Sequence, residues 1–160
     1  MAPAPRTRFQ RQAERFASTR AGGWFFVNVA NRVDRGLLRL SRGRLSLAVG
    51  EPVLLLTTRG ARTGARRSTP LLYGTDGDRL VLVASKAGSP QHPAWYRNLK
   101  ANPQVEVIAS GRSGRYRARE AEAEERERLW AQAVEQYSGY DVYQGRTGGR
   151  RIPVVVLEPA

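Results

Sequence analysis

Residues 53–73 read VLLLTTRGARTGARRSTPLLY, which is two largely apolar runs around a basic loop. The run 53–58 is short, continuous and apolar, as is typical of a buried strand, and residues 67–73 have the pattern of a second strand. The loop between them carries four cations that no neighbouring acidic residue neutralises: Arg59, Arg62, Arg66 and Arg67. The stretch predicts a hairpin and leaves open what its loop holds: a phosphate-bearing cofactor, a nucleic acid, an anionic membrane or only solvent.

Further strands follow, most of them joined by short turns such as the one in residues 74–78. Short turns favour antiparallel pairing, and closure of the sheet into a barrel removes its exposed edges. The sequence therefore predicts a mainly β (α+β) barrel of about six antiparallel strands with peripheral helices. The four further strands are expected at residues 79–85, 104–110, 115–120 and 152–157.

Helical spacing marks three segments, and a glycine- and tyrosine-rich loop is expected from the last of them to Arg150. Pro93 is placed as the first residue of a short helix that ends before Pro103, with Trp95 and Leu99 on its inner face. A helix over 24–40 is expected to bury the stripe Phe25, Val29, Val33, Leu37 and Leu40. A later helix is expected to bury the stripe Leu129, Trp130, Ala133, Val134 and Tyr137.

Composition limits the function. The chain has 160 residues, no cysteine, one histidine and a net charge of +13, so disulfides and zinc sites of the usual nitrogen and sulfur ligands are not expected. A Ser-His-Asp hydrolase would rest on His92 alone, without a nucleophile motif. No apolar run approaches the roughly 20 residues of a membrane span. We expect a cytoplasmic protein whose basic residues 1–22 form either a frayed terminus or an amphipathic helix lying on a membrane surface.

The loop 59–67 has the chemistry of an anion site. Gly60 and Gly64 can adopt positive φ, so that backbone N–H groups converge on an anion. Arg62 and Arg67 can add forked, charge-assisted hydrogen bonds, and Thr63 and Ser68 offer hydroxyls. The order of residues matches neither a Walker loop nor a dinucleotide-binding fingerprint. A solvated basic hairpin is the alternative.

Two further segments favour a bound anion with a flat ring. Residues 84–88 read ASKAG and place Lys86 at the end of a strand, either as an anion ligand or simply in water. Trp95 and Asn98 lie three residues apart on the predicted helix, where they would offer an apolar wall and an amide. The alternative is that Trp95 belongs to the core and Asn98 to the helix surface.

Together these segments resemble the deazaflavin-dependent nitroreductase family, also called the F-420-dependent quinone reductases. The resemblance covers about residues 45–158. Its motifs are LTTxGxxTG at 56–64, RxxPL at 67–71, ASKxG at 84–88, PxWYxNLKANP at 93–103, YxxYxxY at 137–143 and IPVVV at 152–156.

The resemblance implies a split β-barrel of the FMN-binding-like type over residues 45–160, preceded by a basic arm and helix over 1–44. It implies that the barrel binds coenzyme F-420, a deazaflavin with a phospholactyl linker and a glutamate tail. The phosphate and carboxylates would be held by Arg62, Arg67 and Lys86. The residues implied at the cofactor are Ala61, Arg62, Thr63, Arg67, Ser68, Thr69, Pro70, Leu71, Leu72, Val83, Ala84, Ser85, Lys86, Ala94, Trp95, Tyr96, Arg97, Asn98 and Tyr140.

By the same resemblance, reduced deazaflavin would give a hydride to a quinone or an activated nitro-aromatic. Tyr137, Tyr140 and Tyr143 would hydrogen-bond the acceptor oxygen, with Tyr140 or Tyr143 as the proton donor and Ser85 as a second donor. Alternatively, the tyrosines only pack the loop. Two departures matter: Leu72 stands where members active on bulky nitro compounds have an aromatic residue, and Ala61 stands where a second basic residue is common.

The sequence leaves several hypotheses about the partners and the functional class of the protein. The basic arm would suit access to a lipid quinone at an anionic membrane, and the chain is expected to be a monomer or a homodimer. One alternative is a split barrel that uses another flavin, or that stores F-420 or a lipid without turnover. Nucleic-acid binding is a further alternative on charge alone, but the arginines are scattered over every segment and no binding motif is found, so no nucleic-acid partner is expected.

Overall fold

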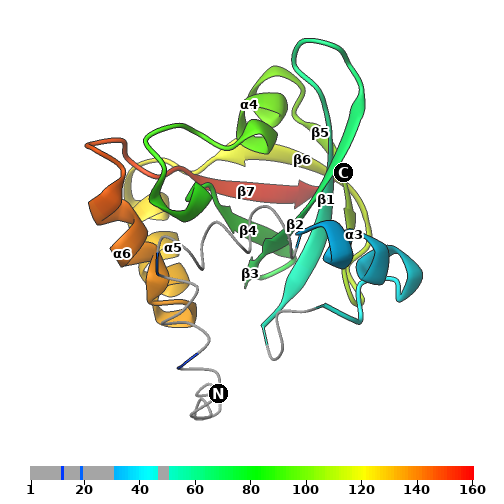
Figure 1. The fold of residues 1–160 in the computed structure, drawn as a ribbon, viewed down its shortest axis with the longest axis horizontal. Coiled ribbons are helices and arrows are strands. Elements are labelled where there is room, and N and C mark those ends of the chain that lie inside the picture. Colours follow the sequence, from blue (N-terminus) through cyan, green and yellow to red (C-terminus); the bar gives the residue numbers. More distant parts are fainter. Residues whose placement is uncertain (1–11, 13–18, 20–30, 47–50) are drawn as a thin grey trace.

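The computed structural model describes residues 12, 19, 31–46 and 51–160. The predicted arm, apart from residues 12 and 19, and the first part of the helix predicted over 24–40 lie outside these residues. The described strands form one antiparallel sheet in the order β2-β1-β5-β6-β7-β4-β3 (Figure 1). They are β1 (Val53–Arg59), β2 (Arg66–Leu72), β3 (Gly74–Asp76), β4 (Arg79–Val83), β5 (Gln104–Ile108), β6 (Gly114–Glu120) and β7 (Val154–Pro159).

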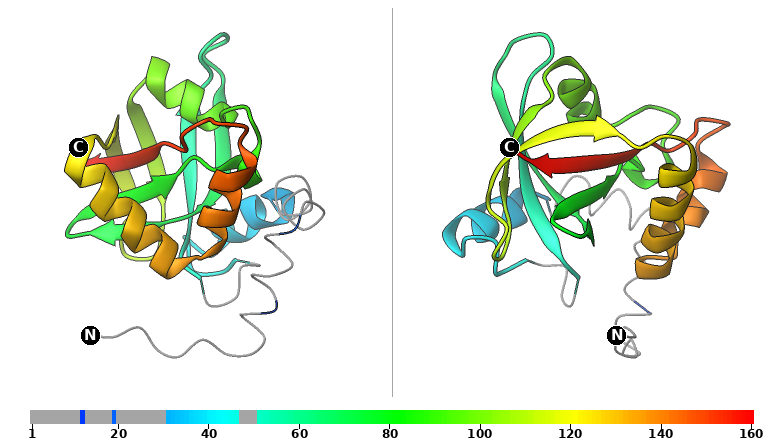
Figure 2. Two further views of the ribbon diagram at one scale, coloured as in Figure 1. Left: turned by 90° about the vertical axis from the view of Figure 1, so that its left-hand side faces the viewer. Right: turned by 180° about the vertical axis from the view of Figure 1, so that it is seen from behind.

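Helices lie at the periphery of this sheet, as expected. Among the described residues they are α3 (Asn31–Leu40), α4 (Ala94–Ala101), α5 (Ala123–Gln136) and α6 (Gly139–Arg146), and the 3-10 turn η2 (Lys86–Gly88). In Figures 1 and 2, α3 lies on the side of β1 and β2, whereas α5 and α6 lie on the opposite side of the molecule. Within the described ranges, no helix has the length and apolar character needed to cross a bilayer.

The β1–β2 hairpin is paired along its whole length, from Val53 opposite Leu72 to Arg59 opposite Arg66. Since β1 also pairs with β5 through Leu55 to Thr57 only, the far end of the hairpin extends beyond the sheet. Figures 1 and 2 show this tip projecting past the other strands. The predicted hairpin is confirmed, and its basic loop is carried on the projecting tip.

Alternation along β1 separates two layers of core. Leu54 and Leu56 face the barrel interior, where they join a cluster that includes Trp95, Leu99 and Val155. The opposite face of the sheet is covered by helices. There Val53 and Leu55 pack with Leu38 of α3, Val81, Val154 and Val156 pack with Leu129 of α5, and a third cluster contains Tyr137, Tyr140 and Tyr143.

Two elements differ from the sequence expectation. Residues 74–76 form the short strand β3, and the turn to β4 is made by Gly77 (φ 65°) and Asp78, so the sheet has seven strands among the described residues rather than six. The predicted loop before Arg150 contains α6, because buried Tyr140 and Tyr143 give it an apolar face.

The stripe predicted on α3 is wrong in the part that the structure describes. Val33 and Leu40 are 51% and 88% exposed, whereas Asp34 and Leu38 are buried. The buried carboxylate is satisfied by the Ser46 hydroxyl, which donates to Asp34 Oδ2 at 3.1 Å. The face that α3 buries is therefore set by its packing on the β1–β2 hairpin, not by its most hydrophobic residues.

Candidate active site

Asn98 fixes the tip of the β1–β2 hairpin to α4. Its Oδ1 atom accepts a hydrogen bond from the backbone N–H of Ala61 at 3.0 Å, and its Nδ2 atom donates to Thr58 Oγ1 at 3.1 Å. Asn98 and Thr58 are both buried. Loss of either hydrogen bond would leave a buried polar atom without a partner, which would destabilise the folded protein. The basic loop is therefore held in place from the α4 side.

The other face of the hairpin is held by α3. Thr57 Oγ1 and Ser68 Oγ lie 2.9 Å apart across the strand pair, and Arg39 Nη2 donates to Ser68 Oγ at 3.0 Å. Because side chains alternate along a strand, Ser68 faces α3 while its neighbours Arg67 and Thr69 face the α4 side. The two faces of the hairpin tip thus have separate helix partners.

A hollow of about 1460 Å³ surrounds this tip, between α3, α4 and the adjoining strands. It includes both faces of the tip, since Arg39 and Ser68 line it on the α3 side and Trp95 and Asn98 line it on the α4 side. More than half of the predicted cofactor residues line it: Ala61, Arg62, Thr63, Arg67, Ser68, Thr69, Ala94, Trp95, Arg97 and Asn98.

The cations of this hollow are not equivalent. Arg66 is paired with Glu106, with Nη1 3.0 Å from Oε1, and this hydrogen bond raises the pKa of the guanidinium. Within the part of the chain that the structure describes, Arg62, Arg67 and Arg97 have no carboxylate partner. These three guanidiniums keep their donors available for an anion.

The predicted catalytic tyrosines form one cluster. The ring centroids of Tyr137 and Tyr140 are 5.1 Å apart, those of Tyr137 and Tyr143 are 6.1 Å apart, and the Tyr137 and Tyr143 hydroxyl oxygens are 3.1 Å apart. Leu72 and Val83, two of the predicted cofactor residues, pack against this cluster. The structure therefore joins the tyrosines to the far end of β2, but not to the arginine-lined hollow itself.

The three hydroxyls differ in what they bond. Burial raises the pKa values of Tyr140 and Tyr143, so both phenols are protonated near neutral pH. The Tyr140 hydroxyl has no hydrogen-bond partner among the described residues, although no fully buried side-chain polar atom there lacks one. Among the described residues, Tyr140 is therefore the tyrosine of this cluster whose hydroxyl is not bonded to protein.

The segment after β4 places the remaining predicted residues. Ala84 is buried in the barrel core, and Ser85 and Lys86 are half-buried at the start of η2. Lys86 and Ala87 have φ values of 46° and 52°, in the left-handed region that non-glycine residues avoid. On β2, Pro70 is buried and Leu71 packs on the barrel core.

Tyr96, one of the predicted cofactor residues, makes its contacts with Glu120 and His92. It is buried, and its hydroxyl donates to Glu120 Oε2 at 2.7 Å. Burial and this bond raise its pKa. Its ring lies 4.7 Å from the ring of His92, centroid to centroid.

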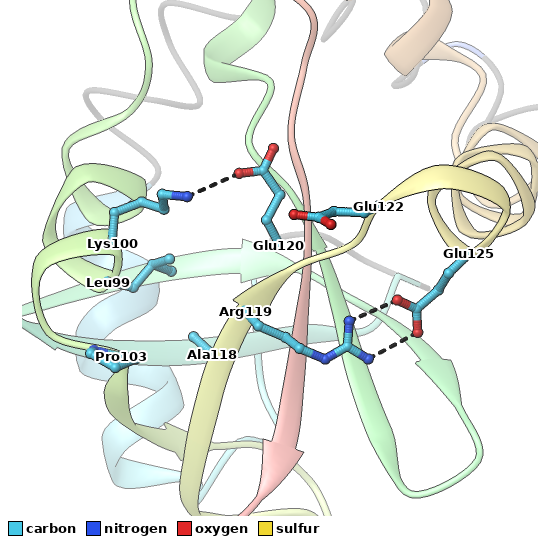
Figure 3. A pocket seen from close by; sticks show the side chains of 8 residues that line it. All are labelled: Leu99, Lys100, Pro103, Ala118, Arg119, Glu120, Glu122 and Glu125. Carbon is cyan, nitrogen blue, oxygen red and sulfur yellow. Dashed lines mark hydrogen bonds and ion pairs between the residues drawn. The ribbon is translucent and has the colours of Figure 1, made fainter.

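A second hollow, of about 530 Å³, lies near Glu120, and the side chains that line it are drawn in Figure 3. Both of its cations are paired with carboxylates: Lys100 Nζ is 3.3 Å from Glu120 Oε2, and two Arg119 nitrogens donate to Glu125 at 2.7 and 2.9 Å, while a third carboxylate, that of Glu122, also lines it. Among the described residues, no group of three or more acidic or histidine side chains is arranged to hold a metal ion. Because its cations are already paired with carboxylates, this second hollow is a weaker anion site than the first hollow, where Arg62, Arg67 and Arg97 have no carboxylate partner within the described ranges.

Several residues of the site are not evident from sequence. Arg32, Arg35 and Arg39 of α3 line the first hollow, and their spacing places them on one helix face. The sequence shows this spacing, but it does not indicate which strands α3 packs against, and so it does not place these arginines at the hollow. Arg150, which contacts residues 84–92, has no local sequence signal at all.

Comparison with known proteins defines the family. The family described as F420H(2)-dependent quinone reductase matches residues 31–159. The F420H(2)-dependent quinone reductase Rv1261c of Mycobacterium tuberculosis is 40% identical over 131 residues, which is 79% of this chain and 87% of the relative. This chain belongs to that family, a family of oxidoreductases named for their use of coenzyme F-420.

Two solved structures agree. One, described as a domain-swapped dimer, has a TM-score of 0.64 and 40% identity, covering 79% of this chain and 97% of its own. The other, the F420-H2 dependent reductase FDR-A, has a TM-score of 0.59 and 44% identity, covering 67% and 94%. The expected FMN-binding-like split barrel is confirmed. The domain boundary at residue 45, the oligomeric state and the individual site residues stay predictions.

The surroundings of His92 predict a pH-dependent stability. Burial and then the charge of Arg150 lower the pKa of His92 from its ordinary 6.5, with Glu120 opposing them. The unfolded chain therefore binds this proton at higher pH than the folded protein does, and stability is lost as pH falls below 6.5. Relative to His92→Gln, which does not titrate, the wild type should lose unfolding free energy between about pH 7 and pH 5 in urea denaturation. A difference that stays constant over this range would contradict the assignment.

Proposed function

We propose that this chain binds coenzyme F-420 and, with its reduced form, transfers a hydride to a quinone-like acceptor. The observation that carries the proposal is three guanidiniums without a carboxylate partner among the described residues: those of Arg62 and Arg67 on the hairpin tip that Asn98 holds in place, and that of Arg97 on α4. Such a site selects a ligand that brings its own negative charge. Family membership supports the identity of that ligand.

The donor set fits this cofactor. The hollow at the tip offers arginines, the hydroxyls of Thr63 and Thr69, and the apolar ring of Trp95. Arg67 and Leu72 lie five residues apart on β2, which is roughly 17 Å in a strand. We therefore assign the anionic end of the ligand to the hairpin tip and its ring to the tyrosine end of β2, with Lys86 as a further cation. Among the described residues Lys86 has no carboxylate partner.

Reduced deazaflavin supplies the hydride to the acceptor. The work of the protein is to position the two rings and to stabilise the negative charge that develops on the acceptor oxygen. Tyr140 is suited to the second task because its hydroxyl is free, whereas those of Tyr137 and Tyr143 are close enough to bond each other. A phenol whose pKa is raised by burial keeps its proton near neutral pH, so Tyr140 is better suited to donating a hydrogen bond than to transferring a proton. Ser85 is the second candidate donor.

The acceptor is proposed to be a quinone rather than a bulky nitro-aromatic. Leu72 packs against the tyrosine cluster, so the residue at this position shapes the acceptor end of the site. An aliphatic side chain there removes the aromatic surface against which a large nitro compound would stack. Reduction of a small quinone needs no such surface.

Removal of Arg67 tests the anion site. Arg67→Ala should raise the dissociation constant of oxidised F-420 about tenfold or more, since a charge-assisted bond contributes roughly 1.5–3 kcal/mol. Quenching of tryptophan fluorescence during titration measures it. Arg117→Ala is the matched control, because Arg117 is exposed on β6 and does not line the hollow. Equal affinities for Arg67→Ala and Arg117→Ala would remove Arg67 from the site.

Replacement of single tyrosines tests the division of roles. Tyr140→Phe should lower kcat for menadione reduction about 10- to 100-fold, as loss of a donor to developing charge does. The KM for reduced F-420 should change little. Tyr137→Phe, which removes one hydroxyl of the Tyr137–Tyr143 pair, is the control and should retain more activity. If Tyr137→Phe is the more damaged variant in steady-state assays, the assignment of Tyr140 is wrong.

We also propose that the basic N-terminal part contacts an anionic membrane, where a lipid quinone would be found. Residues 1–22 lie largely outside the described residues, but the end of α3 and the residues after it support the idea: Leu40 and Leu45 are 88% and 60% exposed, near Arg42 and Arg44 in sequence. The full chain should co-sediment with anionic vesicles at low salt and should not do so with neutral ones. Equal recovery of full chain and a variant lacking residues 1–22 would end the proposed role of the arm.

A further inference from the structure

Arg150 uses its whole guanidinium to hold the segment 84–92. Nε donates to Ser89 O at 3.1 Å, and Nη2 donates to Ser85 O at 2.9 Å and to Ser89 O at 2.8 Å. Nη1 donates to Ala84 O at 3.2 Å and lies 3.3 Å from His92 Nδ1. A guanidinium has five N–H donors, and these contacts account for all of them. Arg150 therefore has no donor left for a phosphate or a carboxylate.

The backbone of Arg150 is fixed from α6. Gln144 Nε2 lies 2.8 Å, and Thr147 Oγ1 2.7 Å, from the Arg150 carbonyl oxygen, and Thr147 is only 1% exposed. The Gln144 side chain also accepts a hydrogen bond from the N–H of Ile152 at 2.9 Å. Arg150 thus links the helix that carries Tyr140 and Tyr143 to the segment that carries Ser85 and Lys86.

The linked segment lies directly against α6, as Figure 1 and the left view of Figure 2 show. Gly88 has φ 80°, and a Cβ atom there would lie 2.8 Å from the carbonyl oxygen of Tyr143. The left-handed conformations of Lys86 and Ala87 are unfavourable by themselves, so other contacts must hold them. The Arg150 hydrogen bonds on both sides of these residues, to Ser85 and Ser89, are contacts of that kind.

We propose that Arg150 is a positioning residue of the cofactor site, an inference that rests on the proposed function. It fixes the conformation of residues 84–89, and so the places of Ser85 and Lys86 relative to the tyrosines on α6. It does not touch the ligand. This separates Arg150 from Arg62, Arg67 and Arg97, whose donors are free for an anion.

Arg150→Lys tests this, because lysine keeps the charge but has only three donors on one nitrogen. Arg126→Lys is the matched control: Arg126 is buried and, like Arg150, donates to a backbone carbonyl, that of Ile152, at 3.1 Å, but it does not contact residues 84–92. Hydrogen–deuterium exchange on the cofactor-free proteins reads out the segment directly. The amides of Gly88 and Ser89, which donate to Ser85 O and Lys86 O, should exchange faster in Arg150→Lys only.

Affinity gives the second readout. The dissociation constant of oxidised F-420 should rise roughly tenfold in Arg150→Lys, as for a segment that is competent about a tenth of the time, and should not change in Arg126→Lys. The KM for reduced F-420 should rise with little change in kcat. If Arg150→Lys does not fold, Thr147→Val, which removes one of the two hydrogen bonds to the Arg150 carbonyl oxygen, should give a smaller effect in the same direction.

The outcomes separate the two proposals. Unchanged exchange in residues 84–92, or faster exchange with an unchanged dissociation constant, would overturn the assignment of Arg150. Equal effects in Arg126→Lys would overturn it too, because they would reflect general destabilisation. If the wild type does not take up F-420, the proposed function fails, and with it the role of Arg150 in cofactor binding.

Discussion

The site depends on the buried amide of Asn98. Its two polar atoms bond the backbone of the basic loop and a threonine of β1, which fixes a projecting hairpin tip to the helix beside it. A loop of this composition would otherwise have to be ordered by the ligand, and that ordering would cost affinity. With the amide bonds made in advance, the arginines of the tip are held near one another despite their mutual repulsion.

The arginines that give the chain its high positive charge differ in their partners. Arg66 is paired with Glu106, Arg119 with Glu125, and Arg150 with backbone carbonyls. These side chains stabilise the fold and leave little to offer a ligand. Arg62, Arg67 and Arg97, which have no carboxylate partner among the described residues, line one hollow at the hairpin tip instead. The distribution of partners, rather than net charge, is what distinguishes a cofactor site from a generally basic surface.

Features that depend on interactions between residues close in sequence can be predicted from the sequence pattern. The hairpin over residues 53–73, the burial of Trp95 and Leu99, and most of the stripe of α5 follow from short-range alternation or helical spacing. The structure confirms the hairpin and buries Leu129, Ala133 and Tyr137, whereas Trp130 and Val134 are half-buried. The segments that carry the site can be identified from sequence because their motifs occur in order. The motifs do not indicate that Asn98 is buried and bonded to protein, which is neither a helix-surface position nor a free amide for the ligand.

The remainder could not be predicted, because it depends on contacts between distant segments. The face that α3 buries is chosen by the strands beneath it, so a stripe containing Val33 and Leu40 is misleading. Helix α6 contains two glycines and few strong helix formers, and the packing of its tyrosines overrides that weak propensity. Arg150 reaches carbonyl groups more than 60 residues away in sequence, for which no local pattern exists.

The most direct test of the central claim is one single-turnover experiment. The protein loaded with reduced F-420 is mixed anaerobically with menadione, and the visible absorbance of the oxidised deazaflavin is followed. The account predicts that this absorbance returns in one phase much faster than in the same mixture without protein. A protein that leaves this rate unchanged, or that ignores F-420 while binding FMN tightly, would contradict the account.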